Sequence, residues 1–237
     1  TANTLLSLRI GHVALSCLRE GSAALSGKAG AKVRRQAMLD AISQRRPEVA
    51  YYLMREKIRT FRDNHAIGVF EEAQYQSAAG EFCELRAWVL AHLLWDPDAD
   101  TDTLVRDFIS GYYGAAAPCI QAYFDLSQSL VREDTHFGIY CKEDDPIFSD
   151  EFLAEATALL DRAREAAASP RERDEVDKVR LQILFLKTMR DKDGSLKDGT
   201  FAEFCSLVRK WDVEMQEGRN FTQFLEHNGF PVPAGNP

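Results

Sequence analysis

The sequence lacks any apolar run that approaches the roughly 20 residues of a membrane-spanning helix. Residues 1–25 also lack the basic start and the small-residue cleavage site of a secretory signal. We therefore expect no membrane partner. Because the sequence begins with Thr1 rather than Met, the missing signal leaves the localisation open.

The sequence also lacks cysteine and histidine residues at the spacings of a metal site or a disulfide framework. The five cysteines are far apart and include no Cys-x-x-Cys pair, and the five histidines show no metal-ligand spacing. The stretch Gly21–Ala29 approaches a phosphate-binding loop, but Ser22 and Ala29 stand where that loop needs a glycine and a hydroxyl. The stretch Asp191–Gly199 lacks the ligand spacing of a calcium loop and is predicted to be a hydrophilic turn. We expect no metal and no cofactor.

The sequence also lacks an excess of basic over acidic residues. The 237 residues carry a net charge of -8, which argues against a dedicated nucleic-acid binder. Basic residues gather between Lys28 and Arg62, where they predict a solvated helix face or a face that meets a missing acidic part of the protein. Hydrophobic residues make up 45% of the chain, enough to bury a core.

Helical periodicity is what the sequence has in abundance. From residue 81 onward apolar residues recur every three to four positions, and upstream the same pattern is weaker but includes residues 49–61. The helix over residues 81–95 is expected to bury a wide stripe made of Phe82, Leu85, Trp88, Val89, Ala91, Leu93 and Trp95. The next helix is expected to bury Leu104, Phe108, Ile109 and Tyr112.

Helix starts are marked by capping residues. Ser149 precedes two acidic residues, and Ser169 is followed by proline at the first helical position and glutamate at the third. These patterns predict helices that begin near residues 150 and 170. Two further amphipathic helices are expected over residues 201–211 and 221–225.

One stretch reads as a strand. Residues 67–70 are apolar or small, and Glu71 and Glu72 follow directly, with Gln74 and Tyr75 close behind. Carboxylates at the C-terminal end of a barrel strand face substrate and serve as acid, base or sugar-hydroxyl acceptor. The alternative is a solvated loop after an edge strand.

Several motifs resemble one family. They include a helix that ends in Leu-Leu-Trp-Asp-Pro, the Tyr-Tyr-Gly junction at residues 112–114 and the Phe-Ser-Asp-Glu-Phe-Leu run at residues 148–153. Over residues 53–225 the chain resembles the C-terminal part of an uncharacterised bacterial glycoside-hydrolase-like family, which is distantly similar to alpha-glucuronidases. Glu72 falls on a functional-looking glutamate position of that family. The resemblance implies a role in polysaccharide degradation, a saccharide or uronic acid ligand, and export to the periplasm or the exterior.

The expected fold is mainly α, a multi-helix bundle with at most one or two short strands left from the end of a (β/α) barrel. Residues 1–50 are an unplaced helical segment, residues 51–80 resemble the last barrel repeat, and residues 81–237 form a C-terminal helical domain. A full barrel needs eight strands and about 200–250 residues of its own. We therefore expect this chain to lack a complete catalytic site, and its catalytic residues stay unknown.

Two functions follow from this organisation. In the first, the chain is the C-terminal part of a carbohydrate-active protein, in which Glu72, supported by Glu71, Gln74 and Tyr75, contributes to a sugar subsite. In the second, it is a non-catalytic helical interaction or assembly module. The second predicts that Ile67, Val69 and Phe70 are buried by helices. An upstream barrel domain or a second copy of the chain is the expected protein partner.

Overall fold

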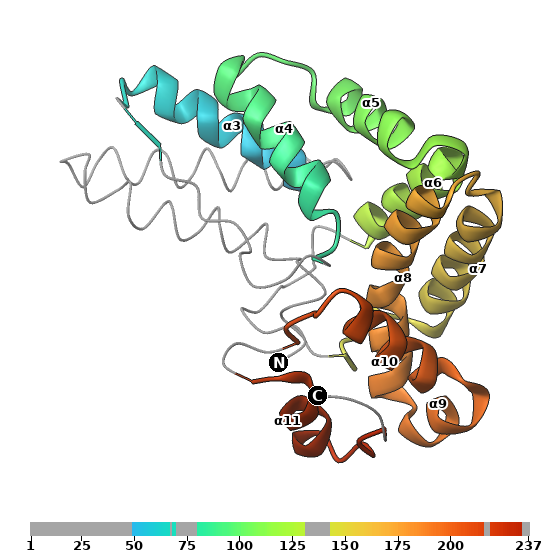
Figure 1. The fold of residues 1–237 in the computed structure, drawn as a ribbon. Coiled ribbons are helices and arrows are strands. Elements are labelled where there is room, and N and C mark those ends of the chain that lie inside the picture. Colours follow the sequence, from blue (N-terminus) through green and yellow to red (C-terminus); the bar gives the residue numbers. More distant parts are fainter. Residues whose placement is uncertain (1–48, 67, 70–79, 131–142, 216–218, 234–237) are drawn as a thin grey trace.

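The computed structural model describes residues 49–66, 68–69, 80–130, 143–215 and 219–233 (Figure 1). Within these residues the chain is mainly helical and forms no β-strand, which confirms the expected multi-helix bundle. The helices are α3 (Val49–Asp63), α4 (Cys83–Trp95), α5 (Thr101–Tyr113), α6 (Ala117–Ser129), α7 (Asp150–Ala166), α8 (Pro170–Arg190), α9 (Lys192–Asp198), α10 (Thr200–Lys210) and α11 (Phe221–His227), with a 3₁₀ turn at Gly114–Ala116.

Helix α8 forms the centre of the bundle. It packs against α5, α7, α9 and α10, and Figure 1 shows α7 running beside it. Its second half is buried on nearly every side, with buried residues Val176, Asp177, Val179, Leu181, Gln182, Ile183, Leu184, Phe185, Leu186 and Thr188. Residues 181–186 are buried without interruption, so this half of α8 lies in the interior and the other described helices pack around it.

The expected capping residues start α7 and α8. The Ser149 hydroxyl accepts a hydrogen bond from the Phe152 amide, and the Ser169 hydroxyl accepts one from the Glu172 amide. These bonds satisfy amides that the first helical turn leaves without a partner. The Glu172 side chain reaches back to the Ala168 amide, one residue before the cap.

The stretch predicted as a hydrophilic turn is a helix instead. The Asp191 carboxylate accepts a hydrogen bond from the Gly194 amide, which caps α9, and Ser195 is buried against the bundle. Gly199 then ends α9 with a left-handed backbone, φ 91°, which glycine adopts at little cost. The prediction was wrong because the acidic residues act as helix caps.

The buried stripe predicted for α4 is half wrong. Phe82, Leu85, Val89 and Leu93 are buried as expected, but Trp88 is 41% exposed, Trp95 is 92% exposed and Ala91 is exposed too. Among the described helices, α3 and α5 make the main contacts with α4.

In α5 the buried face is shifted by one position. Val105 and Tyr113 are buried together with Ile109, whereas Leu104, Phe108 and Tyr112 are half-buried. The shift leaves Phe108 and Tyr112 facing the edge between α4 and α5, where Phe108 meets Trp88.

Candidate functional site: the flanks of residues 70–79 and the α4–α5–α8 edge

The four predicted site residues, Glu71, Glu72, Gln74 and Tyr75, lie outside the described residues, so their prediction stays a prediction. Of the predicted strand, Gly68 and Val69 are described, and neither belongs to a strand. Val69 is 42% exposed. The interaction-module hypothesis predicted that Val69 is buried, so this part of that hypothesis was wrong. The structure does describe the chain on both sides of residues 70–79.

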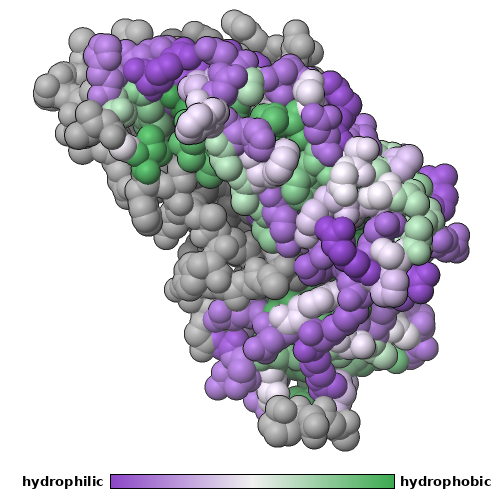
Figure 2. Space-filling view, turned by 45° about the horizontal axis from the view of Figure 1, so that its top comes forward, coloured by the Kyte–Doolittle hydropathy of each residue, from purple (hydrophilic) through white to green (hydrophobic). Residues whose placement is uncertain are grey.

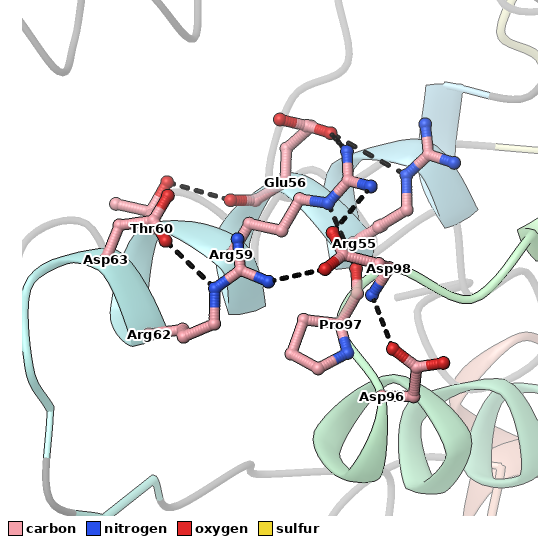
Figure 3. Close-up of polar contacts among 9 residues, drawn as sticks. All are labelled: Arg55, Glu56, Arg59, Thr60, Arg62, Asp63, Asp96, Pro97 and Asp98. Carbon is pink, nitrogen blue, oxygen red and sulfur yellow. Dashed lines mark hydrogen bonds and ion pairs between the residues drawn. The ribbon is translucent and has the colours of Figure 1, made fainter.

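The upstream flank is held by α3. Arg59 donates a hydrogen bond from Nε to the Pro97 carbonyl at 3.0 Å, and its guanidinium also pairs with Asp98 at 3.0 Å. Arg62 pairs with the other oxygen of Asp98 at 2.8 Å. Figure 3 shows the two arginines reaching from one helix to the loop that joins α4 to α5. We call these four residues the α3 clamp.

The α3 clamp explains part of the basic region. Within α3, Arg59 also pairs with Glu56, and Arg62 with Asp63 (Figure 3). These two arginines therefore meet acidic groups of the same chain, an arrangement that the charge pattern did not predict. The arginine partners and a hydrogen bond from Thr103 hold the pKa values of Asp98 and Asp100, respectively, below their ordinary range.

The downstream flank is held by residues 80–82. The Tyr123 hydroxyl of α6 donates a hydrogen bond to Glu81 at 2.7 Å. Phe82 is buried and packs edge-on against Phe124, with ring centroids 5.5 Å apart. Phe82 adopts a left-handed backbone, φ 49°, which is uncommon for a bulky residue and persists here because its ring is locked in the core.

Burial raises the pKa of the Glu81 carboxyl above its ordinary value, and the hydrogen bond from Tyr123 offsets only part of that effect. The same burial raises the pKa of Tyr123 well above its usual range. The hydrogen bond between Tyr123 and Glu81 holds the chain immediately after residues 70–79 against α6.

A second group of side chains gathers next to this flank. Glu84 of α4 and Glu175 of α8 both approach the Lys178 ammonium, at 3.7 and 2.9 Å, and Glu175 also accepts a hydrogen bond from the Tyr112 hydroxyl at 2.9 Å. We call Glu84, Glu175 and Lys178 the polar cluster. Burial works to lower the pKa of Lys178, but the bond to Glu175 and the charge of Glu84 raise it above its ordinary value.

Cys83 borders the polar cluster. Its thiol donates a hydrogen bond to Glu84, and burial, followed by that bond, raises the thiol pKa to about 12. Since the thiolate is the reactive form, Cys83 is unsuited to nucleophilic chemistry at neutral pH. No group of three or more histidine, cysteine or carboxylate side chains is placed to hold a metal among the residues that the structure describes.

Sequence reasoning did not find the polar cluster. Glu175 and Tyr112 are 63 positions apart, and only the packing of α5 against α8 brings them together. The one available signal was that Arg171, Glu175 and Lys178 share a helix face at spacings of four and three. Tyr113, the neighbour of Tyr112 in the sequence, is buried in the core.

None of the described helices is both long and apolar enough to cross a membrane. In the space-filling view, the hydrophobic surface is strongest in the upper half, over α3, α4 and α5 (Figure 2). The exposed large hydrophobic residues of this region are Val69, Trp88, Leu94 and Trp95.

These features describe a helical bundle with an aromatic, partly charged surface along the edge formed by α4, α5 and α8. Residues 37–125 match the model of a family described as "Domain of unknown function (DUF4838)". The match runs from α3 into α6 and supports a relation to an uncharacterised family. No curated protein and no solved structure matches the chain.

Proposed function

We propose that this chain is the C-terminal helical portion of a carbohydrate-active, glycoside-hydrolase-like protein, and that it contributes a sugar-subsite glutamate, Glu72, rather than a full catalytic site. Glu71, Gln74 and Tyr75 complete the proposed subsite. The proposal starts from the resemblance of residues 53–225 to that class of protein. The family match over residues 37–125 overlaps the same region but carries no activity of its own.

The observation that carries the proposal is that the chain is fixed both before and after residues 70–79. The α3 clamp fixes the chain before residues 70–79, and Glu81 with Phe82 fixes it afterwards, both against one helical body. Val69, between the clamp and Glu72 in the sequence, remains 42% exposed. Flanks that are fixed on one helical body suit a binding role for the residues between them, because fixed ends reduce the ordering cost of binding.

A second candidate function is supported by a different observation. Leu94 is 46% and Trp95 is 92% exposed at the end of α4. Exposed apolar groups of this size, when they lie together, mark protein interaction sites. They fit an interaction or assembly module whose partner is an upstream barrel domain or a second copy of the chain.

A thermal-shift experiment tests the first function. Methyl α-glucopyranoside, N-acetylglucosamine and glucuronate are screened against the unaltered chain, Glu72→Ala and the control Glu155→Ala, which changes an exposed glutamate of α7. A sugar at ten times its dissociation constant stabilises by about 1.4 kcal/mol, which for a chain of this size raises the melting temperature by roughly 3–6 °C. The rise is expected to disappear in Glu72→Ala and to persist in Glu155→Ala.

Persistence of the shift in Glu72→Ala contradicts the subsite assignment. Cooperative melting with no response to any of the three sugars contradicts the carbohydrate function as a whole. In that case the interaction module becomes the better account of the exposed end of α4.

A further inference from the structure

Trp88, Phe108 and Tyr112 form a row of rings along the edge between α4 and α5, which we call the aromatic strip. The ring centroids of Trp88 and Phe108 are 5.9 Å apart, and those of Phe108 and Tyr112 are stacked at 4.7 Å. Trp88 is 41% exposed, and the other two rings are half-buried. The strip therefore presents aromatic surface to solvent while its rings are held in place by one another.

Neighbouring groups fix the ends of the strip. The His92 ring lies 4.1 Å from the Trp88 ring, and a hydrogen bond between His92 and the Trp88 carbonyl sets its position. At the other end, the Arg171 guanidinium lies 5.1 Å over the Tyr112 ring, in cation–π range. Rings that are held in this way lose little freedom when they bind a ligand.

The polar cluster borders the same end of the strip. Glu175 holds the Tyr112 hydroxyl, and Lys178 lies between Glu175 and Glu84. Arg171 has no hydrogen bond or ion pair with any described residue, so its donors are available to a ligand. The surface next to the strip thus offers carboxylate acceptors and cationic donors side by side.

The charges around Tyr112 cancel. Glu84 and Glu175 are balanced by Lys178 and Arg171, so this surface favours neither an anion nor a cation. A ligand that fits must have an apolar face for the rings and an edge of groups that both donate and accept hydrogen bonds. An uncharged pyranose has this combination, with ring C–H groups on one face and hydroxyls around its rim.

We propose that the aromatic strip and the polar cluster form a second saccharide-binding surface, selective for uncharged pyranoses, with Trp88 as the stacking platform and Glu175, Lys178 and Arg171 as hydroxyl partners. This inference rests on the proposed carbohydrate function. It assigns that function to residues of α4, α5 and α8 rather than to Glu72. The Glu72 subsite and the strip can therefore succeed or fail separately.

Ligand-observed NMR, by saturation transfer to the sugar protons, tests the strip. The probes are methyl β-glucopyranoside, which is uncharged, and glucuronate, which is an anion. A monosaccharide on an open surface is expected to bind with a dissociation constant of about 1 mM. Trp88→Ala is expected to weaken binding of the uncharged probe at least tenfold, whereas Trp88→Phe retains most of it.

Trp95→Ala is the matched control, because it removes a tryptophan of the same helix that is 92% exposed and makes no recorded ring contact with the strip. Circular dichroism of each variant shows that the helices remain folded. Binding that is lost in Trp88→Ala and kept in Trp95→Ala and Glu72→Ala supports the strip.

Three outcomes overturn the proposal: unchanged binding in Trp88→Ala, tighter binding of glucuronate than of the uncharged probe, and no binding of either probe at 50 mM. Binding that is lost in Glu72→Ala but kept in Trp88→Ala also overturns the strip, while it supports the Glu72 subsite. The two assignments are therefore distinguished by one set of variants.

Discussion

Helices α4 and α8 make opposite use of their apolar residues. From Val176 onward α8 is buried on nearly every side between α5, α7, α9 and α10. Helix α4 (CELRAWVLAHLLW) is almost entirely apolar in sequence, yet Trp88, Leu94 and Trp95 are exposed. Apolar composition alone therefore does not decide burial. The side of α4 that the described bundle leaves uncovered is where we place ligand and partner binding.

The largest expected effect on stability comes from truncating a buried side chain of α8. Phe185 is 2% exposed and its ring packs near Phe204 and Phe224, so Phe185→Ala is expected to lower the free energy of unfolding by about 3–5 kcal/mol. Chemical denaturation measures the change. Trp95→Ala in α4, the contrasting variant, is expected to change it by less than about 0.5 kcal/mol. Equal losses in the two variants would remove the contrast between the helices.

The second prediction concerns the residues just before α4, and its expected effect depends on pH. Burial raises the pKa of Glu81, so its contribution to stability is complete below the ordinary carboxyl pKa and is lost as pH rises through the folded-state pKa. Glu81→Gln removes this loss, so its melting temperature relative to the unaltered chain is expected to rise with pH above about 4.5.

Melting curves at closely spaced pH values check this expectation. The exposed Glu155 of α7 supplies the control, Glu155→Gln, whose difference from the unaltered chain is expected to be flat with pH. A flat difference for Glu81→Gln as well contradicts a raised pKa of the Glu81 carboxyl at the start of α4.

The smallest expected effect concerns the cap of α8. Ser169→Ala removes the acceptor for the Glu172 amide and is expected to cost about 1 kcal/mol. Ser169→Asn restores an acceptor and is expected to recover most of this loss. Helix α4 has no such cap, because Phe82 provides no side-chain hydrogen bond there. A loss that Asn does not repair points to a packing role for Ser169 instead.

The features that could best be predicted from the sequence are those set by residues a few positions apart, such as helix starts and ends. Ser149 and Ser169 start their helices where expected, and Asp96-Pro97 ends α4, because caps and proline act within a few residues. Asp191–Gly199 was misread since the same acidic residues suit a turn and a cap.

Features that depend on packing between helices could not be predicted from the sequence. The periodicity of residues 81–95 shows which side chains are apolar but not how many neighbours cover them, so Trp88 and Trp95 were placed in the core. The polar cluster joins residues of different helices that no local pattern connects. The strand at residues 67–70 was proposed from composition, and only Gly68 and Val69 are described, neither of them in a strand.

The Arg180 side chain has a mechanical consequence for the bundle. It pairs at once with Asp161 of α7, Asp177 of α8 and Glu203 of α10, and Asp177 is shared with Arg164 of α7. Asp177 is only 4% exposed, so a helix that moved away alone would leave a charge without its partner in a dry environment. We expect the three helices to open as one cooperative unit. The surface formed by α4 and α5 is joined to this unit by the hydrogen bond between Tyr112 of α5 and Glu175 of α8.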